Sequence, residues 1–158
     1  MNGASGAVGT NAVQLAKHSG ATVTGVTSTA NVGLVTELGA DRVLDYTRDD
    51  LSCIAERFDV VLDTVGSLTI ASGRRLLTDG GVLLLGVAGL GDTLRARGDV
   101  AAGTSPERVE DFEYLLGLVA AGRLTVVLDP EATSSSRSPT RTGRVDSGHK
   151  VGNVVVRP

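Results

Sequence analysis

Short apolar runs alternate with helical patterns along most of this 158-residue chain, and this alternation most constrains its fold. Residues 58–63 (FDVVLD) and 82–87 (VLLLGV) are apolar in their centres, as strands covered on both faces are. Strands separated by helices of about ten residues pair in parallel, because each crossover returns the chain to the same end of the sheet. The sequence therefore predicts a single α/β domain with a doubly wound parallel sheet.

The boundaries of the expected elements follow from hydrophobic period, glycine stops and capping residues. Pro106 in the first turn and Glu107 three residues after Thr104 predict the start of the longest helix. Residues 78–81 (TDGG) predict a turn. Helices are expected at 8–19, 31–39, 49–57, 68–77 and 104–122, and strands at 21–27, 42–46, 58–63, 82–87 and 124–128.

The chain changes character after residue 129. Residues 130–144 (PEATSSSRSPTRTGR) contain one alanine as their only apolar residue, so they cannot bury enough surface to offset the entropy of ordering. We expect a nucleotide-binding domain over residues 1–129, a disordered or divergent segment over 130–144, and a final strand segment over 145–158.

Composition narrows the class of protein. Fifteen basic and eighteen acidic residues give a formal net charge of -3, which argues against nucleic acid as a partner. A single cysteine, Cys53, excludes an internal disulfide and is typical of a reducing compartment. No apolar run approaches the ~20 residues that a membrane span needs. We therefore expect a cytoplasmic protein that binds neither membranes nor nucleic acid.

Residues 2–10 (NGASGAVGT) place three glycines just before a helical pattern. Such a turn brings backbone close to a pyrophosphate, and the N–H groups and partial positive charge of the helix start hold the anion. Ala4 stands where the usual G-x-G-x-x-G has its first glycine. The alternative is a turn kept only for strand–helix packing. The candidate backbone contacts are Ser5, Gly6, Ala7, Val8 and Gly9.

Further blocks follow the glycine turn in order: AVQLAK at 12–17, VTGVTST at 23–29, ELGADRVLDYT at 37–47, FDVVLDTVG at 58–66 and GHKVGNVVV at 148–156. Together they resemble the medium-chain dehydrogenase/reductase superfamily, in particular its zinc-free quinone oxidoreductase-like branch. The resemblance covers most of residues 2–128 and 145–157. It implies a Rossmann-type sheet with strand order 3-2-1-4-5-6 and a bound nicotinamide dinucleotide.

The chain departs from the family in three places. The family's N-terminal substrate-binding domain is absent. The family's first, central strand normally runs into NGAS, so that strand is largely missing from this sequence. Residues 130–144 do not resemble the family's amphipathic helix, and either a pair of compensating frameshifts or divergence into a loop accounts for this.

The end of the second family strand sets cofactor preference. NAD-specific sites usually carry an acid there, but none occurs between Gly9 and Glu37. Hydroxyls in this stretch are able to bond a 2′-phosphate, although relatives place a basic residue where Ala30 and Asn31 stand. Ordinary helix capping is the alternative role. NADP(H) is slightly favoured over NAD(H), with candidate contacts at Thr27, Ser28, Thr29, Asn31 and, by resemblance, Tyr46.

Two further groups of candidate residues, 64–66 and 86–88, follow the carboxyl ends of strands, where ligands bind in open α/β sheets. By resemblance their backbones flank the nicotinamide and its ribose, and Asn153 lies near the cofactor in the closing motif. One cysteine and two distant histidines supply no zinc set. No catalytic side chain is assigned, because this branch acts by orienting the cofactor. The candidates are Thr64, Val65, Gly66, Gly86, Val87, Ala88 and Asn153.

The resemblance implies an NAD(P)H-dependent oxidoreductase that transfers hydride to a quinone or to an activated carbonyl or alkene. The chain represents its cofactor domain, and without the substrate domain it can lack activity. The alternatives are a non-catalytic dinucleotide-binding module and an inactive truncated remnant. The resemblance also implies a homodimer through edge strands, with residues 124–128 as the pairing edge.

Overall fold

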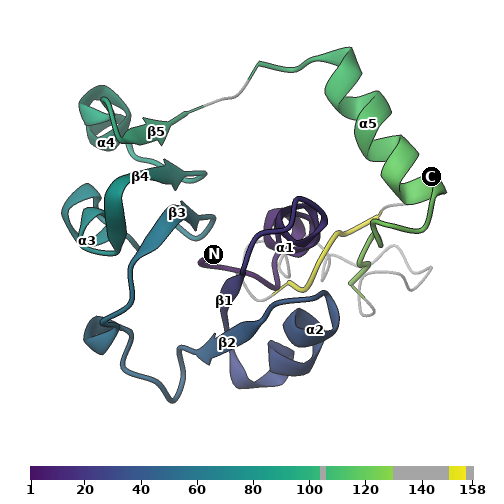
Figure 1. Ribbon diagram of the computed structural model, residues 1–158, viewed down its shortest axis with the longest axis horizontal. Helices are drawn as coiled ribbons and strands as arrows, with labels where there is room; N and C mark the ends of the chain where they lie inside the picture. Colours follow the sequence, from purple (N-terminus) through teal and green to yellow (C-terminus); the bar gives the residue numbers. More distant parts are fainter. Residues whose placement is uncertain (104–105, 130–149, 156–158) are drawn as a thin grey trace, which may run out of the picture.

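The computed structural model describes residues 1–103, 106–129 and 150–155. Its strands are all parallel and form two groups (Figure 1). In one group β1 (Thr24–Thr27) pairs with β2 (Arg42–Asp45). In the other, β4 (Leu77–Leu85) lies between β3 (Phe58–Asp63) and β5 (Val100–Ala102). The predicted α/β fold with a parallel sheet is confirmed.

Asn2 joins the two groups of strands. It forms a parallel bridge with Val26 of β1 and another with Asp63 of β3. The order across the sheet is therefore β2, β1, Asn2, β3, β4, β5, which is a doubly wound order with its central strand reduced to one bridging residue. Within the described residues, Asn2 alone occupies the place between β1 and β3.

Helices flank both groups of strands, whereas the last helix, α5, lies apart from them (Figure 1). The longer helices are α1 (Ala7–His18) and α5 (Val109–Ala120), and the shorter ones are α2 (Val32–Glu37), α3 (Ile70–Arg74) and α4 (Leu90–Arg95). Single 3-10 turns, η1 (Thr29–Asn31) and η2 (Leu51–Cys53), follow β1 and β2. Figure 1 shows α3 and α4 to the left of strands β3–β5 and α1 to their right.

The core divides into two hydrophobic clusters. The first packs α1 and α2 against β1 through small and β-branched side chains: Ala4, Val13, Val23, Val35 and Ala40. The second packs α3 against the strands of the three-stranded group through Val61, Leu83, Leu85 and Val100. Gly73 allows this approach, because a Cβ there would lie 2.6 Å from Leu83 Cδ2.

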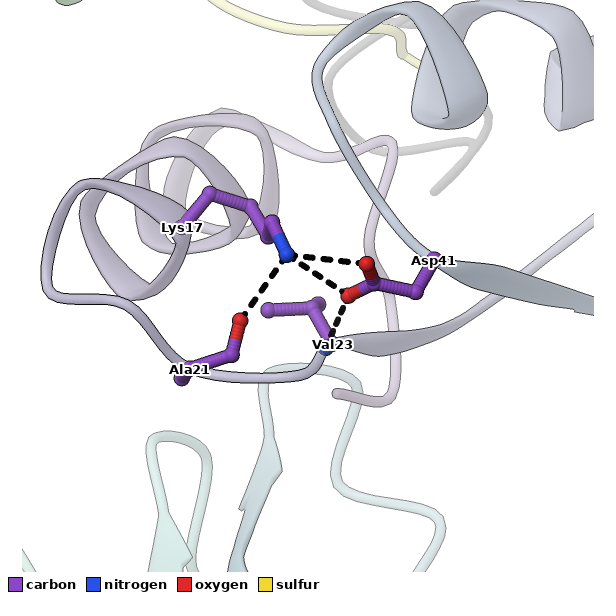
Figure 2. A network of polar contacts seen from close by, with 4 residues as sticks. All are labelled: Lys17, Ala21, Val23 and Asp41. Atoms are coloured by element: carbon purple, nitrogen blue, oxygen red, sulfur yellow. Dashed lines mark hydrogen bonds and ion pairs between the residues drawn. The ribbon is translucent and has the colours of Figure 1, made fainter.

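A polar network fixes the entry to β1 and β2 (Figure 2). Lys17 Nζ, in the last turn of α1, donates to both carboxylate oxygens of Asp41 at 2.9 and 2.8 Å and to the carbonyl of Ala21. Asp41 also accepts from the backbone N–H of Val23 at 2.7 Å. These bonds, led by the one from Lys17, lower the pKa of Asp41 below its ordinary value.

Several predicted elements differ from the structure in the region after β2. The helix expected over 49–57 is only the three-residue turn η2. Asp49, the first residue of the expected helix, accepts from the backbone N–H of Asp45. The turn expected at 78–81 lies inside β4, where β3 and β4 shift register between Phe58 and Val60. The glycine pair that indicated a turn therefore lies in an irregularity of the pairing between β3 and β4.

The later part of the chain also corrects the predictions. Helix α4 and strand β5 were not expected, and α5 begins at Val109, so Pro106 and Glu107 precede it rather than cap it. Residues 124–128 form a single bridge, Leu128 with Asn153, instead of a strand. The segment 130–144 lies outside the described residues. Within the described residues, no helix is long and apolar enough to cross a membrane.

Candidate functional site

The glycine turn leads directly from Asn2 into α1, and two of its glycines are required by packing. Gly3 has φ +81, and a Cβ there would lie 2.4 Å from Thr64 Oγ1. A Cβ on Gly9 would lie 2.1 Å from the carbonyl oxygen of Gly3. At Gly6, by contrast, a Cβ would meet the same oxygen at an ordinary 3.5 Å. Packing therefore accounts for Gly3 and Gly9 but leaves Gly6 free to admit another group.

The N-terminus of α1 faces this turn. Gly6 is the N-cap and has no side chain to accept the first N–H groups, and the first turn of α1 contains no acid. The amides at the start of a helix have no intrahelical partner, so they concentrate partial positive charge. Val8 in this turn is 61% exposed, so the helix start is accessible. The arrangement has the features of an anion-binding helix terminus.

Asn31 links the end of β1 to the glycine turn. Its Nδ2 donates to Ser5 Oγ at 3.3 Å and to Ser28 Oγ at 3.2 Å, and Thr27 Oγ1 donates to Ser5 Oγ at 2.8 Å. Because both serine oxygens accept, their own hydrogens can point to a further acceptor. Asn31 is the N-cap of α2 but makes no capping bond with its side chain. The side chain of Asn31 therefore connects β1 to the glycine turn and does not cap α2.

An acid reaches this region from the neighbouring strand. Asp45, at the end of β2, accepts hydrogen bonds from the hydroxyls of Thr29 and Thr47 and from the backbone N–H of Thr47. Burial opposes ionisation of Asp45, but these bonds outweigh it and lower its pKa. The sequence showed no acid before Glu37, yet folding places this carboxylate beside Thr29. The hydroxyl of Thr29 is thus engaged with an acid instead of free for a phosphate.

Tyr46 follows Asp45, and its backbone N–H donates to the carbonyl of Thr27 at 3.0 Å. Its side chain is exposed. The ends of β1 and β2 therefore lie side by side, and the predicted adenosine-side residues after them share one edge of the sheet.

The loop after β3 is organised by Asp63, whose residue is fully buried. Its Oδ1 accepts from Asn2 Nδ2 at 2.9 Å and from the N–H groups of Val65 and Gly66 at 2.9 and 3.1 Å. Its Oδ2 accepts from the N–H of Leu68 at 2.8 Å. This carboxylate is matched to N–H donors at both oxygens, so it fixes the backbone of the predicted nicotinamide-side loop.

The loops after β3 and β4 are in contact. The N–H of Gly86 donates to the carbonyl of Asp63 at 2.8 Å, and a Cβ at Gly66, which has φ +81, would lie 3.0 Å from Val87 Cγ1. Val65 and Val87 are exposed beyond this contact. The structure therefore brings together the two predicted groups, 64–66 and 86–88, at the carboxyl ends of adjacent strands.

The C-terminal segment reaches the glycine turn. Gly152 donates its N–H to the carbonyl of Ser5 at 2.9 Å, and it has φ +60 with Val127 O only 2.5 Å from the place of a Cβ. The side chain of the neighbouring Asn153 donates to the carbonyl of Val127 at 3.1 Å. Asn153 thus lies beside the site, but its side-chain amide is already used in the hydrogen bond to the carbonyl of Val127.

Sequence reasoning missed three residues that order this region: Asn2, Asp45 and Asp63. Asp63 carried a signal, since Asp at the first position and glycine at the fourth is typical of a type I turn. The side-chain partners of Asn2, and Thr29 as a partner of Asp45, lie on other elements, so no local pattern indicated these bonds. Thr47, two positions after Asp45, is its local partner. Among the described residues, no three His, Cys, Asp or Glu side chains are grouped so as to hold a metal ion.

Comparisons with known proteins agree with this geometry. The family model described as zinc-binding dehydrogenase matches residues 7–98. An NADPH-dependent alkenal/one oxidoreductase of Arabidopsis thaliana chloroplasts is 31% identical over all of this chain and 39% of its own length. A chloroplast envelope quinone oxidoreductase homolog from the same plant is 25% identical over all of this chain and 51% of its own.

Solved structures show the same fold. Quinone oxidoreductase of Escherichia coli, complexed with NADPH, has a TM-score of 0.75 at 22% identity and covers 99% of this chain and 56% of its own. The Coxiella burnetii enzyme has a TM-score of 0.77 at 24% identity, covering 96% and 49%. The chain spans about half or less of the curated relatives cited above. It belongs to the zinc-binding dehydrogenase family, within the medium-chain dehydrogenase/reductase superfamily and its quinone oxidoreductase-like branch.

Proposed function

We propose that this chain is the cofactor-binding part of a zinc-free NAD(P)H-dependent oxidoreductase that reduces a quinone or an activated carbonyl or alkene. The observation that carries the proposal is the start of α1, where an uncapped helix terminus lies against a turn in which Gly3 and Gly9 allow close backbone contact. A dinucleotide diphosphate is the ligand that such a terminus suits. Relatives named as NADPH-dependent or quinone oxidoreductases support the same reading.

The predicted contacts divide along the sheet edge. Backbone N–H groups from Ser5 to Gly9 hold the diphosphate, and the loops at 64–66 and 86–88 flank the nicotinamide. Asp63 keeps the first of these loops in place through its bonds to Val65 and Gly66. When bound, the cofactor supplies the hydride, so the chain's own task is to bind and orient it.

NADP(H) remains slightly favoured over NAD(H) in this proposal. The hydroxyls of Ser5 and Ser28 both accept from Asn31, which leaves their hydrogens to donate to a 2′-phosphate. The negative charge of Asp45 disfavours a 2′-phosphate. However, the hydroxyls of Thr29 and Thr47 donate to its carboxylate, and the residue is only 8% exposed. A cytoplasmic location and a homodimer stay predictions.

The central test places a charge at the helix start. Val8→Glu puts a carboxylate beside the diphosphate site while favouring the helix itself, because acids in a first turn interact well with the dipole. We expect Val8→Glu to weaken NADPH binding by roughly tenfold, about 1.4 kcal/mol, in titration calorimetry. Val8→Gln has the same size without charge and is the matched control, so it should bind within about twofold of the parent.

Turnover distinguishes the enzyme from the alternative of a non-catalytic module. NADPH oxidation with a quinone acceptor, measured on protein that binds NADPH, would support the enzyme. Binding without oxidation of NADPH would favour the module. If neither NADPH nor NADH gives heat with well-folded protein, cofactor binding itself is wrong for this chain.

A further inference from the structure

Helix α5 carries a row of apolar side chains on an exposed side. The row consists of Val109, Phe112, Leu116 and Val119, whose spacing of three, four and three residues places them along one face of a helix. All four are exposed, Phe112 to 58% and Leu116 to 68%. Leu118 points to a different side of α5 and is buried. The helix therefore packs against the molecule through one side and presents this row, the α5 stripe, on another.

The rest of the chain offers little to cover the α5 stripe. Helix α5 lies apart from the strands, in the upper right of Figure 1. The sequence of residues 130–144 contains one alanine as its only apolar residue, so this segment does not supply a matching apolar surface. Exposed apolar side chains that are contiguous, unlike scattered ones, indicate an interaction surface.

The spacing of the α5 stripe is that of positions a and d in a coiled-coil heptad, with Val109 at a and Phe112 at d. In this register Arg108, the N-cap of α5, takes position g, and Glu113 takes position e. The two charged residues are five positions and so about 140° apart around the helix, which places them on opposite flanks of the stripe. Neither forms an ion pair with another described residue.

These flanking charges complement each other between two copies of the chain. In a parallel pair of helices, position g of one copy faces position e of the next heptad of the other. Arg108 of one copy then faces Glu113 of the second, five positions further along, and two-fold symmetry forms this pair twice. An antiparallel pair would instead bring position e toward position e, and the two Glu113 side chains would repel each other. The charges therefore favour a second copy in the parallel orientation.

We propose that the α5 stripe is a self-association surface through which two copies of this chain form a parallel two-stranded coiled coil. The four apolar side chains form the a and d layers, and Arg108 pairs with Glu113 of the other copy on both flanks. Helix α5 has only 12 residues, so the interface is smaller than the ~1,200 Å² of a stable complex, and the dimer is weak. This surface differs from the edge expected at 124–128, where the structure has a single bridge.

The first test measures association of the whole chain by sedimentation equilibrium. We expect the mean mass to rise from one chain toward two between roughly 10 µM and 1 mM protein. Leu116→Glu places a charge inside the apolar layers and should weaken association at least tenfold, or about 1.4 kcal/mol. Tyr114→Glu is the matched control, because Tyr114 is exposed on another side of the same helix, and it should associate within about twofold of the parent.

Two outcomes of this test would overturn the proposal. A parent chain that stays monomeric over the whole range would do so, and it is the result expected if residues 130–149 of the same chain cover the stripe. Association that Leu116→Glu leaves unchanged would place the contact on another surface, such as residues 124–128. Far-ultraviolet circular dichroism of each variant checks that the helix content is retained.

The second test exchanges the flanking charges. Arg108→Glu and Glu113→Arg each put like charges opposite each other twice, so each should weaken association by about fivefold. The double variant restores opposite charges in the parallel pair and should associate within about twofold of the parent. A double variant that associates no more tightly than either single variant would overturn the parallel orientation.

Discussion

The side-chain amide of Asn2 donates to Oδ1 of Asp63 at 2.9 Å, and this bond ties the one bridging residue of the central strand to the loop after β3. The same carboxylate oxygen accepts from the backbone of Val65 and Gly66. One buried side chain therefore joins the middle of the sheet to a predicted cofactor loop.

Asp63→Asn should destabilise the protein. The amide places an NH₂ group where an oxygen now accepts from N–H donors, so at least one buried donor loses its partner, at a cost of about 2 kcal/mol. Urea unfolding measures the change. Asp59→Asn is the control on the same strand: Asp59 is exposed and its Oδ1 accepts from Thr78, a bond that asparagine can keep. A loss no larger for Asp63→Asn than for Asp59→Asn would contradict the role given to Asp63.

Gly9→Ala should destabilise the fold by about 3 kcal/mol, because its Cβ would overlap the carbonyl of Gly3 and the backbone of Ala4. Gly6→Ala offers a matched comparison in the same turn, with φ -76 and an ordinary contact at 3.5 Å. Its cost should be about 1 kcal/mol or less, from the weaker N-cap. Thermal unfolding of both variants gives the comparison, and similar losses at the two positions would refute the close approach at Gly9.

Asp41→Asn should change how stability depends on acid. The folded pKa of Asp41 is lowered, so its contribution is present above the ordinary value of 3.8 and is lost as the pH falls through the folded pKa. The parent should therefore exceed the variant in stability near neutral pH, and the difference should shrink below about pH 4. Urea unfolding from pH 7 to pH 2.5 follows this. A difference that stays constant across the range would exclude the ion pair with Lys17 as its source.

Asn31→Asp should shift cofactor preference. A carboxylate between Ser5 and Ser28 would repel a 2′-phosphate but accept a hydrogen bond from a ribose hydroxyl. We expect NADPH affinity to fall at least tenfold relative to NADH affinity in parallel calorimetric titrations, or about 1.4 kcal/mol. Asn31→Ser removes the amide without adding charge, so it should weaken both cofactors to a similar degree. An unchanged ratio in Asn31→Asp would place the 2′-phosphate elsewhere.

The sequence predicted well those elements whose signals are local. Helix α1 and strand β3 were predicted to within about a residue, because periodicity and a following glycine mark one and a continuous apolar run marks the other. The helix expected at 49–57 does not form, because one of its residues bonds to a residue outside the segment. Asp49 is used to accept from the N–H of Asp45, which holds the chain in a turn.

The candidate site shows the same limit. The glycine turn and the strand ends were visible as short motifs, and the structure places them along one edge of the sheet. Asp45 was not recognised, because it acts on Thr29, sixteen positions away and on another element. The negative charge of Asp45 reaches this site only because β2 lies beside β1. The order of the strands determines this, and no single segment of the sequence shows it.

The single residue that bridges β1 and β3 also bears on how the molecule unfolds. Each hydrophobic cluster belongs to one side of Asn2, so we expect two cooperative units that are connected through this residue. Calorimetry should then record two overlapping transitions, with the half containing β1 and β2 separating from the other before either melts completely. Under mechanical load, the bridges of Asn2 to β1 and β3 should be the first contacts to break.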